Sequence, residues 1–355
     1  MMHGSQFPPR KSLFLLWVLL ALFALFQAPL GFAAESANTI ARRMGRGINI
    51  LGYDGLWDGG HNAPFRKSDF ARIRRAGFSH VRINVHAFRY MDPSHQLPPA
   101  FFSRLDWAVQ EAASAGLIPV VDEHDFASCQ DNPEDCRVRL RSFWQAMSNR
   151  YQDKYPTLVF ELLNEPGGSM TAAQWNSISH ELLTIIRETN HHRTLIIPSL
   201  NVDDTSTVEQ LNIPEGDRNI IVAFHYYKPM QFTHQGAPWS KEFGKTDGIS
   251  WGTDQERRQV IQDFNVVQRW AERTGRPVYL GEFGVYEAAG IAGRAEWLRS
   301  VRGEAERRGW AWAVWQFDHD FAVFDSTRSK WIAPLLRALI PTGSPSPSVP
   351  GRVAR

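Results

Sequence analysis

Two glutamates of this sequence occupy positions from which carboxylates could act as an acid, a base or a nucleophile. Glu165 follows the β-rich run Leu158–Leu163, and Glu282 follows the β-rich run Pro277–Gly281. Two carboxyl groups that face one another suit the cleavage of a glycosidic bond, because one protonates the leaving oxygen while the other attacks or activates water. Either glutamate alone could be a structural ion-pair partner, whereas the pair at two strand ends favours chemistry.

The residues beside the two glutamates would help to fix them. Pro166 restricts the residue before it, so we expect an extended backbone at Glu165. Gly281 and Gly284 flank Glu282 and leave room for close approach of the backbone. An acid must keep its proton near neutral pH, whereas a nucleophile must be ionised among hydrogen-bond donors. The two carboxyl groups therefore need different surroundings.

Candidate hydrogen-bonding residues for the pair and for a substrate stand at the ends of other predicted strands. They are Arg82, His124, Asn164, His225 and Tyr227. The two histidines are better suited to bind hydroxyl groups than a metal, because neither has a second histidine four residues away. We therefore expect no metal and no other cofactor.

Eight β-rich runs alternate with helical patterns from Arg43 onward. Several runs are continuously apolar, which is typical of parallel strands that are buried on both faces. Eight successive units predict an α/β fold with a closed (β/α)8 TIM barrel, formed by a single catalytic domain at residues 37–340. The loops after the strands form the active-site face of such a barrel, so the strand-end residues should converge there. The runs are Gly45–Leu51, His80–Val85, Ile118–Glu123, Leu158–Leu163, Thr194–Pro198, Ile220–His225, Pro277–Gly281 and Ala311–Phe317.

The sequence contains 13 tryptophans, which is more than a core needs. Flat aromatic rings match the apolar C–H faces of pyranose sugars, so tryptophans in loops are candidates for sugar binding. Trp315 is the first choice. Trp57, Trp239 and Trp251 follow, although each of these three could simply pack its own loop. Trp239 and Trp251 belong to the longest connection, residues 226–252, which we expect to wall the cleft.

The amino-terminal segment predicts export. Basic residues at positions 10–11 precede an apolar run over residues 12–26, and small residues up to Ala34 complete the pattern of a signal peptide at residues 1–34. An uncleaved membrane anchor is the alternative, because the apolar run approaches the roughly 20 residues that cross a bilayer. We expect a periplasmic or secreted protein without stable membrane association after cleavage.

Cys129 and Cys136 are the only two cysteines among the 355 residues. In an oxidising compartment they should form a disulfide that closes a surface loop, and two free thiols are the alternative. At the other end of the chain, residues 341–355 are rich in proline, serine and glycine, and they predict a disordered tail. With 39 Lys and Arg against 37 Asp and Glu, the net charge of +2 gives no sign of a nucleic-acid partner.

Four motifs together resemble the signature of glycoside hydrolase family 5. The resemblance covers about residues 46–339, with Arg82 and His124 in matching places near the ends of their strands. The stretch from His225 to Trp239 is similar to bacterial members that are endoglucanases, some of which also cut mannan. The motifs are Asn164-Glu165-Pro166, His225-Tyr226-Tyr227, Gly281-Glu282-Phe283-Gly284 and Trp315.

The resemblance implies a retaining endo-β-glycosidase that works by double displacement. Glu165 would be the acid/base and Glu282 the nucleophile. Tyr227 would lie close to the nucleophile, and Trp315 would form a platform under the sugar at the cleavage point. The implied partner is a β-glucan polysaccharide or oligosaccharide, first of all a β-1,4-linked glucan as for a cellulase. A β-mannanase and a glucan transglycosylase are the alternatives, and we expect a monomer.

The sequence departs from the family pattern at two places near the sugar-binding walls. Asp125 follows His124 where many relatives have a second histidine, and the run Gln316–Asp320 is more charged than expected. Both departures leave the exact polysaccharide open among glucan, mannan and xyloglucan.

Two rival hypotheses come from other classes of protein. Gly248-Ile-Ser250-Trp-Gly252 matches the G-x-S-x-G nucleophile elbow of serine hydrolases, but the strand that this motif requires is missing from the preceding sequence pattern. A carbohydrate-binding barrel without turnover would keep the tryptophans and tolerate the loss of either carboxylate. Release of reducing ends from soluble β-glucans distinguishes an enzyme from such a binder.

Overall fold

The computed structural model describes Met1, residues 35–50 and residues 65–341. The predicted signal peptide beyond Met1, the candidate platform Trp57 and the predicted tail after residue 341 lie outside the described residues. The chain divides into two compact units after Ala34, and all the secondary structure described belongs to the second unit. Within the described ranges, no helix is both long enough and apolar enough to span a bilayer.

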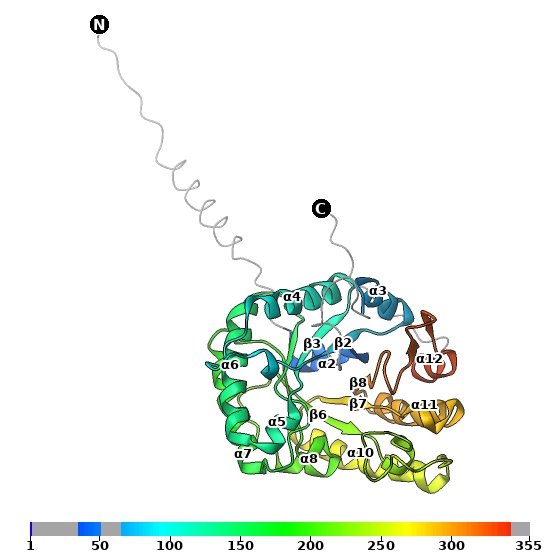
Figure 1. Cartoon of the computed structure of the whole chain (residues 1–355). Coiled ribbons are helices and arrows are strands. Elements are labelled where there is room, and N and C mark those ends of the chain that lie inside the picture. The colour runs from blue at the N-terminus through cyan, green and yellow to red at the C-terminus, as the bar shows by residue number, and fades with distance from the viewer. Residues whose placement is uncertain (2–34, 51–64, 342–355) are drawn as a thin grey trace. The chain divides into compact units, whose positions relative to one another are not determined.

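Eight parallel strands form the centre of the second unit (Figure 1). They are β1 (Arg46–Ile50), β2 (His80–Val85), β3 (Ile118–Glu123), β4 (Val159–Glu161), β5 (Leu195–Pro198), β6 (Ile220–Tyr226), β7 (Val278–Phe283) and β8 (Ala311–Val314). Each strand pairs with the next one along the chain, and β1 also pairs with β8, so that the barrel closes. The predicted TIM barrel is therefore confirmed. Because all strands are parallel, their carboxyl ends meet at one face of the barrel.

Helices surround the strands (Figure 1). The longer ones are α3 (Lys67–Ala76), α4 (Pro99–Ser114), α6 (Pro133–Tyr151), α7 (Ala172–Arg187), α10 (Asp254–Thr274) and α11 (Ile291–Arg307), and the short helix α12 (Ala333–Leu339) follows them along the chain. Capping boxes at Thr171 and Thr253 start α7 and α10. The short segments are α2 (Ala37–Met44), η2 (Phe88–Tyr90), α5 (Phe126–Asp131), α8 (Leu200–Asp203), η3 (Thr205–Gln210), α9 (Met230–Thr233) and η4 (Glu287–Ala289), with the strand pair β9 (Phe324–Asp325) and β10 (Lys330–Trp331).

The apolar core has two parts. The larger part fills the space between the strands and the surrounding helices. The smaller part lies inside the barrel, where Ile40 and Met44 of α2 meet Ile118, Ile221 and Ala311 from the beginnings of three strands. Helix α2 therefore closes the amino-terminal end of the barrel. A cleft for a substrate must lie at the opposite end, where the strands end.

The strand boundaries agree with the sequence prediction to within two residues at most ends. The exception is the end of β8, which stops at Val314 rather than at Phe317, and β4 also stops early, at Glu161 rather than at Leu163. The apolar residues beyond both ends are still buried. An apolar sequence pattern indicates buried residues, and the residues after β4 and β8 remain buried although they no longer pair with a neighbouring strand.

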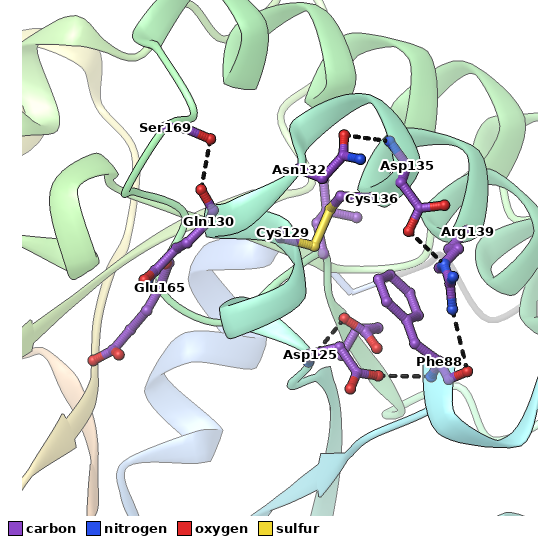
Figure 2. Close-up of a disulfide and its surroundings, with 12 residues drawn as sticks. Phe88, Asp125, Cys129, Gln130, Asn132, Asp135, Cys136, Arg139, Glu165 and Ser169 are labelled. Atoms are coloured by element: carbon purple, nitrogen blue, oxygen red, sulfur yellow. Dashed lines mark hydrogen bonds and ion pairs between the residues drawn. A yellow bond between two sulfur atoms is a disulfide. The ribbon is translucent and has the colours of Figure 1, made fainter. Parts of the chain in front are cut away.

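Cys129 and Cys136 form the predicted disulfide, which links α5 to the first turn of α6 (Figure 2). Both cysteine side chains are fully buried, whereas the sequence suggested a surface loop. The bridge therefore fixes α5 against the rest of the barrel. Figure 2 also shows Gln130, the residue after Cys129, lying beside Glu165.

Candidate active site

A cleft of about 800 Å³ opens at the carboxyl-terminal ends of the strands. Glu165 and Glu282 both line it, so the fold brings together the two carboxylates that are far apart in the sequence. The connection between β6 and α10 forms part of the wall, as expected, through residues that include Tyr227 and Trp239. The other predicted site residues in the lining are His124, Asn164, His225 and Trp315.

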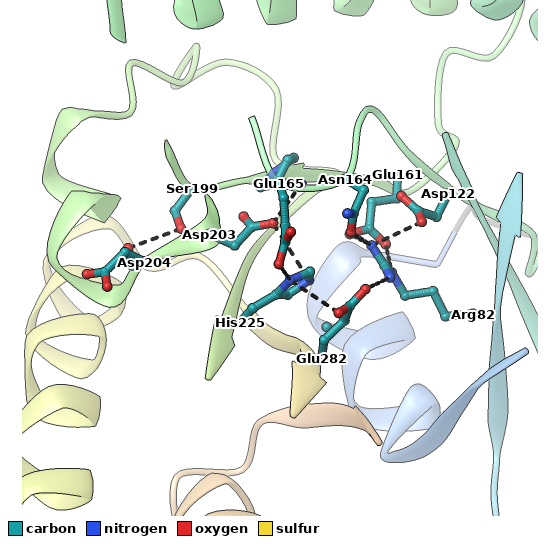
Figure 3. Close-up of polar contacts among 12 residues, drawn as sticks. Arg82, Asp122, Glu161, Asn164, Glu165, Ser199, Asp203, Asp204, His225 and Glu282 are labelled. Atoms are coloured by element: carbon teal, nitrogen blue, oxygen red, sulfur yellow. Dashed lines mark hydrogen bonds and ion pairs between the residues drawn. The ribbon is translucent and has the colours of Figure 1, made fainter. Parts of the chain in front are cut away.

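Glu165 and Glu282 both approach one nitrogen of the His225 imidazole (Figure 3). Nδ1 of His225 is 3.0 Å from Oε1 of Glu165 and 3.7 Å from Oε2 of Glu282. One carboxyl oxygen of each glutamate and a ring nitrogen of His225 all lie within 4.8 Å of one another. The two carboxyl groups are therefore close enough to act on the same bond and to influence each other's ionisation.

Glu282 lies near the carboxyl end of β7. The pairing of β6 with β7 shifts register between Phe224 and His225, where Gly281 of β7 is the extra residue, and this shift places His225 opposite Glu282. Such bulges commonly re-aim side chains beside active sites. Oε1 of Glu282 accepts a hydrogen bond from Nη1 of Arg82 at 2.7 Å, and Oε2 accepts one from the hydroxyl of Tyr227 at 2.7 Å. Burial raises the pKa of Glu282 to about 7, and both donors oppose that rise. They favour the ionised form that a nucleophile requires.

Two glycines beside Glu282 leave the room that the sequence indicated. A Cβ atom at Gly281 would lie 2.9 Å from Nε2 of His225. A Cβ atom at Gly284 would lie 2.2 Å from the carbonyl oxygen of Trp315. A larger residue at either position would displace a neighbouring group of the cleft.

Glu165 stands in a loop, four residues beyond the end of β4. Its φ angle is +45°, in the left-handed region, so the expectation of an extended backbone before Pro166 is wrong. The N–H of Glu165 donates to Oδ2 of Asp203 at 3.1 Å, and its carbonyl oxygen accepts from Nε2 of Gln130 at 3.0 Å. These tertiary hydrogen bonds outweigh the local preference, which for a left-handed residue amounts to about 1–2 kcal/mol.

Glu165 is the harder of the two carboxyl groups to ionise. Burial raises its pKa well above the usual range for a glutamic acid, and the negative charge of Glu282 adds to the rise. Arg82 opposes the rise in pKa, but its guanidinium donates directly to Glu282. Glu165 and Glu282 therefore share one proton over a range of pH. That proton belongs to Glu165, because the hydrogen-bond donors Arg82 and Tyr227 favour the ionised form of Glu282. Glu165 is suited to protonate a leaving group, and Glu282 is suited to attack.

The guanidinium of Arg82 is fully buried beneath the cleft, among several acids (Figure 3). Besides Glu282 it contacts Glu161 through Nε at 2.8 Å and through Nη2 at 3.1 Å. Its Nη2 also lies 3.1 Å from Oδ2 of Asp122 and donates to Oδ1 of Asn164 at 2.9 Å. The sequence suggested Arg82 as a substrate-binding residue. The structure places it below the residues that line the cleft, where it orients the carboxylates instead.

Trp315 and His124 form a flat platform in the lining of the cleft. Their rings are stacked, with centroids 5.6 Å apart and planes only 4° from parallel. Nδ1 of His124 lies 2.6 Å from Oδ2 of Asp122, which fixes the orientation of the imidazole. Burial lowers the pKa of His124 well below its usual range, so the ring is neutral. A neutral, flat surface of this kind suits the apolar face of a sugar ring.

The two tryptophans of the long connection have different positions. Trp239 lines the cleft, is 50% exposed and packs edge-on against Tyr286. Trp251 is only 6% exposed and is absent from the described lining of the cleft. The guanidinium of Arg257 lies 5.2 Å from the centre of the Trp251 ring. Trp251 therefore packs against the beginning of α10, and its position gives no support to the predicted role in sugar binding.

Asp203 and Gln130 hold the backbone of Glu165 and were not predicted from the sequence. Asp203 lies shortly after the end of β5 at Pro198, so the rule that pointed to the other strand-end residues could have found it. Gln130 carries no such signal, because its contact with Glu165 depends on how α5 is fixed by the neighbouring disulfide.

The spacing of Glu165, His225 and Glu282 would also suit a metal ion. Their hydrogen bonds favour another role, since both oxygens of Glu282 accept from protein donors. A cation at this point would compete with the guanidinium of Arg82 for the same carboxylate. The arrangement fits proton transfer and nucleophilic attack better than metal binding.

Replacing Tyr227 by phenylalanine should move the acid limb of the pH profile of kcat/KM to higher pH. The lost hydrogen bond stabilises the ionised form of Glu282, so its removal raises the pKa of that group. A hydrogen bond to a charged group contributes about 1.5–3 kcal/mol, which corresponds to a shift of about one pH unit or more. Tyr226→Phe is the matched control, because Tyr226 donates to Asp263 of α10. An acid limb that moves equally in both variants, or in neither, would contradict this role of Tyr227.

Residues 42–320 match the sequence model described as Cellulase (glycosyl hydrolase family 5). The chain is 29% identical over 320 residues to endoglucanase H of Acetivibrio thermocellus, which covers 86% of the chain and 34% of that protein. It is 26% identical to cellodextrinase A of Ruminococcus flavefaciens, over 74% of the chain and 82% of that protein. The chain thus spans about a third of the length of endoglucanase H.

Solved structures show the same likeness. Endoglucanase Cel5A from the hyperthermophilic Thermotoga maritima superposes with a TM-score of 0.82 and is 35% identical, over 86% of this chain and 100% of that one. Structures of Cel5A are known in complex with mannotriose and with cellobiose.

Proposed function

This chain belongs to glycosyl hydrolase family 5, and we propose that it is a retaining endo-β-1,4-glucanase with Glu165 as acid/base and Glu282 as nucleophile. The observation that carries the proposal is the approach of their carboxyl oxygens to within 4.8 Å beside His225. Retaining glycosidases hold their two carboxyl groups about 5–5.5 Å apart, whereas inverting enzymes leave about 6.5–9.5 Å for a water molecule. The short separation supports the retaining mechanism.

The reaction takes place in two displacements. In the first, an oxygen of ionised Glu282 attacks the anomeric carbon, the bond to the leaving oxygen breaks, and that oxygen takes the carboxylic proton of Glu165. In the second, ionised Glu165 takes a proton from water, the water oxygen attacks the anomeric carbon, and Glu282 is released. Two inversions at one carbon give net retention of configuration.

A β-1,4-linked glucan is the first choice of substrate, because the likeness to endoglucanase H and to Cel5A supports it. The Cel5A complex with mannotriose favours β-mannan as the second candidate. The platform of Trp315 is compatible with both sugars, since stacking depends on the C–H face of the ring. A sugar hydroxyl that replaced water in the second step would give transglycosylation. The signal-like segment at residues 1–34 supports a periplasmic or secreted place of action.

The proposal is tested by incubating the purified chain with carboxymethylcellulose, mixed-linkage β-glucan, galactomannan and xyloglucan. We expect the fastest release of reducing ends from the β-1,4-linked glucans, with a range of oligosaccharide sizes and a first product of β configuration by NMR. Ser250→Ala, a change at an exposed serine outside the described lining of the cleft, should leave the rates unchanged. Faster release from galactomannan would favour the mannanase, and no release from any glycan would overturn the hydrolase.

A further inference from the structure

Asp203 is a fully buried acid that contacts the proposed acid/base in two ways (Figure 3). Its Oδ2 accepts a hydrogen bond from the backbone N–H of Glu165 at 3.1 Å. The same oxygen lies 3.6 Å from Nε2 of His225, whose Nδ1 lies 3.0 Å from Oε1 of Glu165. Asp203, His225 and Glu165 therefore form a continuous chain of polar groups behind the reacting carboxyl group.

Two buried atoms of this polar chain have no hydrogen-bond partner among the described residues. They are Oδ1 of Asp203 and Nε2 of His225. Buried polar atoms in proteins are nearly always paired, and a separation of 3.6 Å is only slightly longer than a hydrogen bond. The imidazole of His225 has little freedom to turn away, because Gly281 packs closely against it. A Cβ atom at Gly281 would lie 2.9 Å from Nε2 of His225. A small approach of Asp203 would form a hydrogen bond with Nε2 of His225.

The backbone that carries Asp203 is strained. Asn201, Val202 and Asp203 have φ angles of +50°, +63° and +57°, a left-handed turn that a β-branched residue such as Val202 rarely adopts. The turn is held against the loop of Glu165, because the N–H of Val202 donates to the carbonyl oxygen of Pro166 at 3.2 Å. Strain of this kind persists where the surroundings impose it, and it commonly accompanies function. Here it directs Asp203 inward.

We propose that Asp203 is a positioning residue for the general acid, because it fixes the backbone of Glu165 and holds the imidazole proton of His225 on Nε2. This inference rests on the proposed glycosidase function. It goes beyond that function in giving a role to an acid that does not itself line the cleft.

The tautomer of His225 decides which form of Glu165 is favoured. With the imidazole proton on Nε2 and directed at ionised Asp203, Nδ1 presents a lone pair and accepts a hydrogen bond from the carboxylic acid of Glu165. This arrangement favours the protonated form of Glu165, which the first displacement needs. A proton on Nδ1 would donate to Glu165 instead and would favour its ionised form.

The charges around this polar chain are consistent with a neutral imidazole. Burial lowers the pKa of His225, while burial followed by the charges of Glu165 and Glu161 raises the pKa of Asp203. An ionised Asp203 would therefore depend on the N–H of Glu165 and on the Nε2–H of His225 that this proposal directs at it. The other titratable or charged groups that face the chain are Arg82 of β2, Asp122 and His124 at the end of β3, Glu161 of β4 and Glu282 of β7.

The test replaces Asp203 by asparagine in the full chain. In Asp203→Asn the side-chain oxygen can still accept the N–H of Glu165, but this oxygen also faces Nε2 of His225 and no longer carries a charge, so it holds the imidazole proton on Nε2 less strongly. We expect kcat/KM on cello-oligosaccharides, whose leaving groups need an acid, to fall at least about tenfold. For 2,4-dinitrophenyl β-cellobioside, whose leaving group needs no acid, we expect less than about a twofold change. The alkaline limb of the pH profile should move to lower pH, because Glu165 loses its proton more readily.

Asp217→Asn is the matched control. Asp217 also accepts a backbone N–H, that of Asn219 at 3.0 Å, and pairs with Arg187, but it precedes β6 at the opposite end of the barrel. It should leave the ratio of the two substrates and the alkaline limb as in the wild type. The ratio is measured on one preparation, so a partly unfolded sample does not alter it.

The outcomes separate this inference from the proposed function. If the wild type is active and Asp203→Asn leaves the substrate ratio and the alkaline limb unchanged, the role of Asp203 is overturned and the glycosidase stands. An equal loss of kcat/KM on both substrates, with the alkaline limb of the pH profile unchanged, also overturns the role of Asp203. Asp203 would then matter only for folding. A wild type that cleaves none of the glycans or aryl glycosides removes the proposed function and this inference together.

Discussion

Glu282→Ala is expected to lose hydrolytic activity by roughly 10⁴-fold or more, because the covalent intermediate can no longer form. The space left by the carboxyl group admits azide, which attacks the anomeric carbon from the side that Glu282 occupied. Glu165 remains in place to protonate the leaving group. The product from 2,4-dinitrophenyl β-cellobioside is therefore an α-glycosyl azide, with inverted configuration, which NMR identifies directly.

Glu272→Ala is the control for this experiment, because Glu272 is exposed on α10. It should keep the activity of the wild type and give no azide product. A β-glycosyl azide from Glu282→Ala, or activity near that of the wild type, would contradict the assignment of Glu282 as nucleophile. Circular dichroism of both variants shows whether the barrel is intact.

The barrel itself could be predicted because its strands are buried on both faces. Burial of this kind requires nearly continuous apolar runs, and β2 and β3 match the predicted runs residue for residue. The ends of β4 and β8 could not be predicted in the same way, because the residues beyond them are also buried. Apolar pattern locates strands better than it locates their ends.

The proximity of Glu165 and Glu282 could be predicted because the fold fixes the geometry of strand ends. Parallel strands bring Glu165 and Glu282 to one face wherever the loops go. The backbone of Glu165 could not be predicted from the sequence. Pro166 favours an extended residue before it, but the N–H of Glu165 donates to Asp203 and its carbonyl oxygen accepts from Gln130, and these two hydrogen bonds outweigh that preference. The local preference imposed by Pro166 therefore fails to predict the backbone of Glu165, the residue proposed as the acid/base.

The electrostatic interactions of the site could not be predicted from the sequence either. The place of Arg82 near the end of a predicted strand indicated that it lies near the cleft. Its contacts with Glu161, Asp122 and Glu282 depend on the packing of the barrel interior, which the sequence does not show. A single guanidinium in contact with three buried acids cannot neutralise all of them. Burial therefore keeps the pKa values of these acids high, and the donors to Glu282 decide that it ionises more easily than Glu165.

Glu165→Ala should slow cleavage in proportion to how much the leaving group needs a proton. A positioned general acid contributes about 10²–10⁴-fold, so we expect losses of that size on cello-oligosaccharides and polysaccharides. With 2,4-dinitrophenyl β-cellobioside the first displacement needs no acid, and the second is slowed because the base is missing. The glycosyl-enzyme on Glu282 then accumulates, and stopped-flow absorbance should record a burst of dinitrophenolate.

Azide distinguishes this variant from the loss of the nucleophile. In Glu165→Ala it attacks the accumulated glycosyl-enzyme from the side that Glu165 occupied, so the product is a β-glycosyl azide with retained configuration. The same anion should thus give opposite anomers with the two variants, because each vacated side chain opens a different face of the anomeric carbon. Equal losses of rate on polysaccharides and on the activated aryl glycoside would show that Glu165 is not the acid. The pairing of opposite anomers is the result that a shared structural defect could not produce.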